Sequence, residues 1–201
     1  MRTQSKLFHA EEKYFNIRDL AWTLLIECDI SELPVDLNKI AALKGWIIMS
    51  ETMYDETIEN EIELRRITVK GKPINIIVYK ETANRYRLRF GIAHEMGHII
   101  LEHLGLTGTQ LETEANMFAA RLLVPRVAIE GLQLKTEEEI MKACDVSAEV
   151  ARFRLKSHAD IMARGKFLSS KLEQKLYEQL ESFFRSKIKS VFPIDENNKK
   201  D

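Results

Sequence analysis

The segment FGIAHEMGHIILEH, residues 90–103, decides how the rest of the chain is interpreted. His94 and His98 are four residues apart, so on a helix both imidazoles lie on one face, about one turn from each other. Glu95 is rotated by about 100° from His94 and lies beside the pair. This H-E-x-x-H spacing is typical of a zinc site in which two histidines bind the ion and the glutamate accepts a proton from water. We therefore predict His94 and His98 as metal ligands and Glu95 as the catalytic base.

The motif does not contain the third ligand that a catalytic zinc usually has beside a position open to water. The metzincin pattern would need glycine at position 101 and histidine at position 104, where this chain has Leu101 and Leu104. That class of protease is excluded. His103 lies about 140° around the helix from His98, so we expect an exposed histidine and not a ligand.

A carboxylate on the next helix is the remaining source of a ligand, and LETEANMFAA offers Glu112 and Glu114. These two are about 200° apart on a helix, so only one can face the metal. Glu112 shares its face with Ala115 and Asn116. Gly97, inside the motif helix, lowers helix stability by about 1 kcal/mol relative to alanine, which suggests that something packs closely there. Small residues beside Glu112 would let its helix make that approach. Asn116 could accept a hydrogen bond from a ligand histidine. We therefore favour Glu112 as the third ligand, with Glu114 as the alternative, and place Asn116 behind a histidine.

The remaining hydrophobic patterns predict a mostly helical α+β protein with a small sheet of about three strands. Strands are expected at 46–54 and in a hairpin over 64–81. Helices are expected at 16–30, 34–45, 84–104, 108–124, 136–145, 147–159 and 169–191. We expect a flexible N-terminus (1–13), a metallopeptidase domain (14–160) that ends in a helical pair, a C-terminal helical extension (161–192) and a disordered tail (193–201).

The composition is that of an ordinary soluble globular protein, with 45% hydrophobic and 30% charged residues and a net charge of −1. Cys28 and Cys144 form no C-x-x-C motif, so two reduced, packed thiols are expected. The N-terminus has no apolar signal-peptide core, and no apolar run reaches the ~20 residues that span a bilayer. We expect a cytoplasmic protein with no membrane partner.

Two blocks of the sequence together resemble the ImmA/IrrE-type metallopeptidase family. The matching positions are Arg89, Phe90, Ala93, His94, Glu95, Gly97 and His98, followed by Glu112, Ala115, Asn116, Phe118, Ala119, Leu122, Leu123 and Pro125. The resemblance extends over about residues 17–158 and implies a compact zincin that binds Zn²⁺ through two histidines and one carboxylate, with Glu95 as the base. It also implies an intracellular, site-specific protease of helix-turn-helix repressors in bacteria and their mobile elements.

Two other functions compete with this interpretation. One is a catalytically silent, zincin-like protein that regulates a DNA-binding partner or contacts DNA through its C-terminal helices. Residues 137–159 have helix-turn-helix spacing, and their second helix carries Arg152, Arg154 and Lys156. We expect these three on a solvated face, Phe153 in the core, and no direct nucleic-acid binding. The other is docking through the apolar stripe of the last helix, which more often packs on its own domain.

Overall fold

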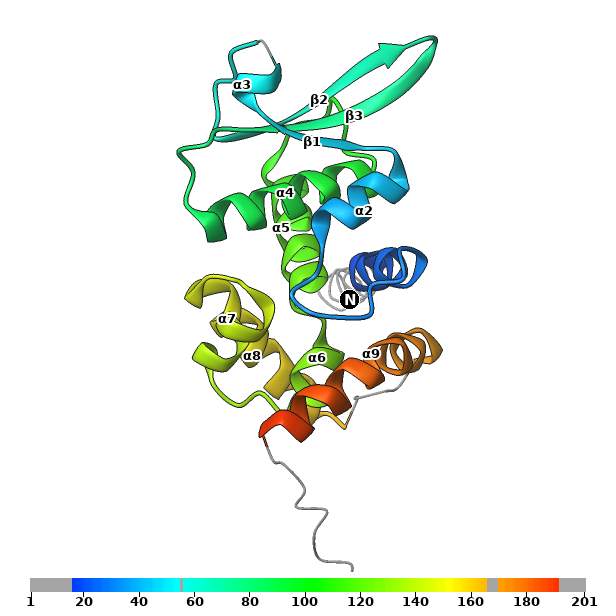
Figure 1. Ribbon diagram of the computed structural model, residues 1–201, viewed down its shortest axis with the longest axis vertical. Helices are drawn as coiled ribbons and strands as arrows, with labels where there is room; N and C mark the ends of the chain where they lie inside the picture. Colours follow the sequence, from blue (N-terminus) through cyan, green and yellow to red (C-terminus); the bar gives the residue numbers. More distant parts are fainter. Residues whose placement is uncertain (1–15, 55, 166–169, 192–201) are drawn as a thin grey trace, which may run out of the picture.

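The computed structural model describes residues 16–54, 56–165 and 170–191 of the 201-residue chain (Figure 1). It confirms an α+β fold in which a small sheet lies at one end of the long axis and the helices α6 to α9 lie at the other. The helix α4 (Arg85–Ile100) lies beneath the sheet, and α5 (Thr109–Leu123) runs from there toward the other end. The predicted flexible N-terminus (1–13) and disordered tail (193–201) lie outside the described residues.

Among the described residues the sheet has three strands, the number that the sequence predicted, and their order is β1-β3-β2. β2 (Ile62–Val69) and β3 (Lys72–Tyr79) form the antiparallel hairpin, and β1 (Ile47–Ser50) pairs with β3 in parallel. The hairpin turns at Lys70 and Gly71, which both have positive φ, as a tight two-residue hairpin turn requires. The predicted strand over 46–54 was too long, because β1 stops at Ser50 and the short helix α3 (Glu51–Tyr54) follows.

Several helix ends lie where the sequence predicted them, but the helix predicted from residue 34 begins at Leu37 and the helix predicted to residue 104 ends at Ile100. Asp36 caps α2 and Gly45 ends it in the left-handed region. Thr136 and Glu139 form a capping box at the start of α7, and Ser147 caps α8. The helix after Pro125 was not predicted. Residues 16–27 are helical, and the other helices are α2 (Leu37–Lys44), α4 (Arg85–Ile100), α5 (Thr109–Leu123), α6 (Arg126–Gly131), α7 (Glu137–Cys144), α8 (Ala148–Ala163) and α9 (Lys171–Val191).

The approach expected at Gly97 is present where α4 packs against α5. A Cβ atom added to Gly97 would lie 3.2 Å from the Cα atom of Ala115 and 3.3 Å from its carbonyl oxygen. Glycine at this position therefore lets the two backbones come close together. Both helices contribute to the main core, in which Ala93, Met96 and Phe118 are fully buried.

The helix α9 packs on the same core as the motif helix. Its Leu176, Leu180 and Phe184 are buried, so this stripe covers the domain and does not form a free docking surface. Glu173 of α9 accepts hydrogen bonds from Arg126 of α6 in a buried ion pair. The predicted boundary between the metallopeptidase domain (14–160) and the C-terminal helical extension (161–192) stays a prediction.

The helical pair α7–α8 differs from expectation at two side chains. Arg154 is buried and donates a hydrogen bond to the carbonyl oxygen of Val124, so it does not lie on a solvated face. Phe153, predicted in the core, is 48% exposed. Arg152 is paired with Glu137.

Cys28 and Cys144 are free and buried, as predicted, and burial raises the pKa of both thiols. Within the described ranges, no helix is both long enough and apolar enough to cross a membrane.

Candidate metal centre

The helix α4 places the two motif histidines on one partly exposed face. Asn84 caps its first turn by accepting a hydrogen bond from the backbone N–H of Tyr86. Ala93, Met96 and Gly97 are buried on the core side of the helix, and the adjoining side carries His94 and His98. The two imidazoles remain 15% and 13% exposed, so small molecules can reach them.

The carboxylate of Glu112 completes a cluster with these histidines. The Nε2 atoms of His94 and His98 are 2.9 Å apart, and the Glu112 oxygens lie 3.2 Å and 3.5 Å from them. Donors bound to one tetrahedral zinc at ~2.0–2.1 Å are themselves separated by about 3.3 Å. The nearer oxygen is Oε2 for His94 and Oε1 for His98, so the two imidazole nitrogens and the carboxylate group together fit a single Zn²⁺, and both are ordinary ligands of that ion.

Asn116 lies behind the first histidine. Its Oδ1 is 2.9 Å from Nδ1 of His94, at the opposite side of the ring from the cluster. For Nε2 to offer its lone pair to a metal, Nδ1 must carry the proton, and Nδ1–H then donates to this oxygen. Asn116 therefore selects the tautomer of His94 that can bind an ion.

His103 lies behind the second histidine, in contrast to the expectation that it is exposed. It is 6% exposed, and its Nδ1 lies 3.3 Å from Nδ1 of His98. Its Nε2 lies 3.3 Å from the Glu114 carboxylate, which is also buried. If the Nε2–H of His103 donates to Glu114, its Nδ1 can accept from the Nδ1–H of His98. The chain Glu114–His103–His98 thus leaves Nε2 of His98 free for a metal.

The end of α4 explains why the prediction that His103 is exposed was wrong, since that prediction assumed a continuous helix. The helix ends at Ile100, and Glu102 adopts a left-handed conformation with a φ of 58°. The N–H groups of Glu102 and His103 donate to the carbonyl oxygens of Ile99 and His98, which is a Schellman motif. This turn brings His103 back toward His98. Because glutamate and not glycine adopts the left-handed conformation, the turn could not be predicted from the residue types.

Glu95 lies beside the cluster in an environment that favours its neutral form. Burial, followed by the nearby carboxylates of Glu112 and Glu63, raises the pKa of Glu95 to about 7 in the metal-free protein. For His98, burial and the neighbouring His94 lower the pKa, so its imidazole is held in the neutral form that binds metals.

The structure thus brings together four of the predicted site residues, His94, His98, Glu112 and Asn116, and places Glu95 beside them. It also separates the two candidate carboxylates, since Glu112 belongs to the group with the two histidines and Glu114 contacts His103 and Gln110. Their roles as ligands and base stay predictions. The sequence did not identify His103 and Glu114 as partners of His98.

A comparison with known families gives independent support for the resemblance. The family described as the IrrE N-terminal-like domain, Peptidase_M78, matches residues 51–156, which is more than half of the chain and includes the whole cluster. A search of curated proteins found no match. The resemblance of the segment before Glu51 lies outside the matched range and stays a prediction.

Proposed function

Because the chain belongs to the IrrE N-terminal-like domain family of peptidases, we propose that it is a zinc-dependent endopeptidase with His94, His98 and Glu112 as its metal ligands. One observation carries the proposal. Two imidazole nitrogens and one carboxylate from two helices converge within 4.8 Å of one another. The Glu112 side chain is 55% exposed, so the cluster is accessible on that side to water and to a peptide.

The side chains around the cluster have different roles in the proposed reaction. When bound, Zn²⁺ supplies Lewis acidity, which acidifies water and polarises a carbonyl group. Glu95 takes the proton of the attacking water and delivers it to the nitrogen of the leaving amine. Asn116 and His103 accept hydrogen bonds from the two histidines and keep their rings oriented.

The proposed substrate is a helix-turn-helix repressor inside a bacterial cell, as the family resemblance implies. Direct binding to DNA is not part of the proposal. Of the three basic residues that suggested it, Arg154 is buried and Arg152 is paired with Glu137. A net charge of −1 gives no general attraction to phosphates.

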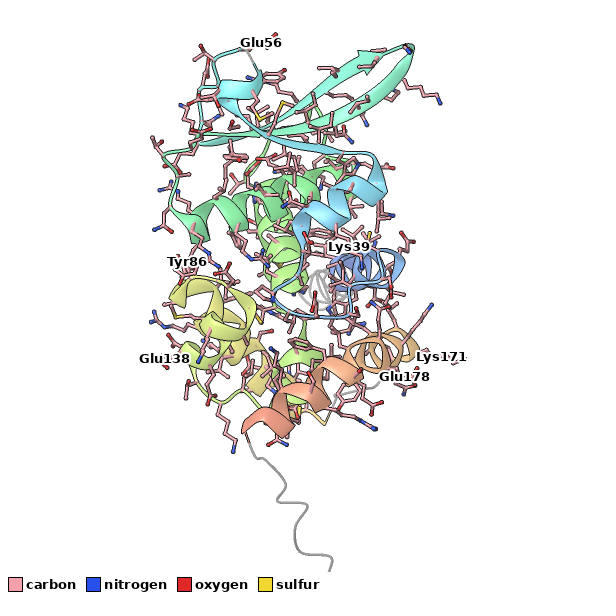
Figure 2. All side chains as sticks on the ribbon, viewed as in Figure 1. Lys39, Glu56, Tyr86, Glu138, Lys171 and Glu178 are labelled. Atoms are coloured by element: carbon pink, nitrogen blue, oxygen red, sulfur yellow. The ribbon has the colours of Figure 1, made fainter. Side chains whose placement is uncertain are left out.

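The test is cleavage of a helix-turn-helix protein encoded beside this chain, followed by intact mass with and without a chelator. Glu95→Gln is expected to keep its zinc and lose cleavage by several orders of magnitude. Glu138→Gln makes the same change at an exposed position of α7 and should cleave normally (Figure 2). Cleavage at the normal rate by Glu95→Gln would contradict the assigned base. Binding of the repressor with no chelator-sensitive cleavage would support the silent regulator instead.

A further inference from the structure

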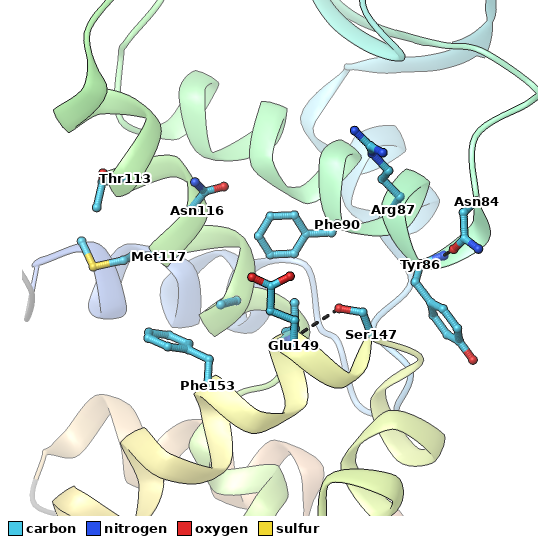
Figure 3. Close-up of a pocket in the computed structure, with 12 residues that line it drawn as sticks. Asn84, Tyr86, Arg87, Phe90, Thr113, Asn116, Met117, Ser147, Glu149 and Phe153 are labelled. Atoms are coloured by element: carbon cyan, nitrogen blue, oxygen red, sulfur yellow. Dashed lines mark hydrogen bonds between the residues drawn. The ribbon is translucent and has the colours of Figure 1, made fainter.

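A cavity of about 720 Å³ lies between α4, α5 and the first half of α8 (Figure 3). Its size falls in the range of ~300–1,000 Å³ that is usual for ligand pockets. The apolar part of its wall comes from all three helices and consists of Phe90, Met117, Ala120, Val150 and Phe153. We call this cavity the α8 pocket.

The α8 pocket adjoins the candidate metal centre through shared residues. Asn116 lines it and also lies 2.9 Å from His94. Phe90 lines it and precedes His94 by four residues, which is about 6 Å along the axis of α4. An extended peptide advances about 3.3 Å per residue. When the bond to be cleaved lies at the cluster, a substrate side chain about two residues away can therefore enter the pocket.

The chemistry of the wall selects for an apolar occupant. The charged residues Arg87 and Glu149 have opposite signs, so the lining has no net charge that would select an acidic or basic group. Phe153 is 48% exposed although it was expected in the core, and Figure 3 shows its ring near Met117. A large apolar side chain that enters here would cover this aromatic surface and gain the free energy of its burial.

We propose that the α8 pocket is the specificity pocket of the peptidase site and takes a large apolar side chain, such as leucine, within about two residues of the bond that is cleaved. This inference rests on the proposed function. It adds a sequence requirement for the substrate that neither the metal cluster nor the family match supplies.

Binding can be measured without hydrolysis by NMR of the full chain labelled with ¹³C at its methionine methyl groups. The probe is N-acetyl-leucine amide, with N-acetyl-aspartate amide as the polar comparison. The Met117 resonance is expected to shift and saturate with the leucine probe, while Met53, which is 73% exposed on α3, stays unchanged. A Met117 signal that does not move, or moves equally with both probes, would overturn the proposal.

A matched pair of variants on α8 tests which residues form the pocket. Phe153→Glu places a charge in the wall of the pocket and is expected to weaken binding of the leucine probe at least tenfold. Met162→Glu makes a comparable change at a 40% exposed position of the same helix outside the pocket, and should bind the probe normally. Equal binding by the two variants would overturn the assignment of the wall.

Cleavage of a random peptide library, read by mass spectrometry, locates the pocket relative to the cut. The zinc-loaded protein is expected to enrich a large apolar residue at one fixed position within two residues of the cleaved bond, and Phe153→Glu should lose that preference. Cleavage with no preference for a large apolar residue would refute the specificity pocket but not the proposed peptidase activity. A saturating Met117 response with no cleavage of peptides or repressor would refute the proposed function and leave the binding site standing.

Discussion

Replacing Gly97 by alanine tests whether the spacing of α4 and α5 sets the geometry of the metal centre. The new Cβ would lie 3.2 Å from two carbon atoms, Cα of Ala115 and Cδ1 of Phe118. Ordinary carbon–carbon contacts are about 3.5–4.0 Å, so the helices must separate by roughly half an ångström. A rotamer change cannot relieve the contact with Ala115, because it involves backbone atoms.

Two opposing terms set the change in stability. Alanine gains about 1 kcal/mol over glycine in a helix interior, and overpacking a core costs about 1–3 kcal/mol. The free energy of unfolding of the metal-free Gly97→Ala protein is therefore expected to fall by about 0–2 kcal/mol. The effect on metal binding is larger, because the histidines lie on α4 and Glu112 on α5. A displacement of about 0.5 Å reaches the limit that a preorganised site tolerates, so we expect about tenfold weaker zinc binding.

The assay is competition for zinc with a chelator of known affinity, together with urea unfolding of the metal-free protein. Gly91→Ala is the matched control on the same helix. Its Cβ would meet the side chain of Ile62, whose terminal methyl can rotate away, and not the backbone of α5. Gly91→Ala should keep the zinc affinity of the original protein. If Gly97→Ala also keeps it and becomes about 1 kcal/mol more stable, the close approach does not set the site.

Three further changes test other parts of the account. His103→Leu should weaken zinc binding about 10–100-fold in the same competition assay, because His98 loses the acceptor that orients it; unchanged affinity would remove His103 from the site. In the protein from which a chelator has removed the metal, the raised pKa of Glu95 means that the folded state holds the proton of this carboxyl group more tightly than the unfolded state does. The free energy of unfolding should therefore fall by up to about 3 kcal/mol between pH 4.5 and 7, and Glu95→Gln should flatten that slope in urea titrations; parallel slopes would contradict the shift. Glu173→Gln removes the carboxylate charge that faces the buried guanidinium of Arg126 and should lower the free energy of unfolding by about 3–5 kcal/mol; a loss below about 1 kcal/mol would show that the pair does not anchor α9.

The parts of the fold that local chemistry determines could be predicted from the sequence. Thr136, Ser147 and Gly45 mark helix ends through their own side chain or their own conformational freedom, so their neighbours along the chain suffice. The spacing of His94 and His98 fixes their common face in the same way. Helical periodicity and the small residues beside Glu112 also sufficed to predict which of the two carboxylates lies with the histidines, while its role as a ligand stays a prediction.

The parts that depend on contacts between distant residues could not be predicted. Glu102 adopts a left-handed conformation that favours glycine, and only the folded chain shows that His103 returns to His98. Arg154 looks like a surface residue in sequence, but it bonds to Val124, which is 30 residues away. The α8 pocket involves three helices, so the exposure of Phe153 follows from their packing and not from the pattern of α8.

The most direct test of the metal centre is X-ray absorption at the zinc edge of the zinc-loaded full chain. We expect one zinc per chain with four light-atom neighbours at about 2.0–2.1 Å, two of them imidazoles, and loss of one light-atom neighbour or of the metal in Glu112→Ala. A sulfur neighbour, a third imidazole, or a spectrum unchanged by Glu112→Ala would contradict it.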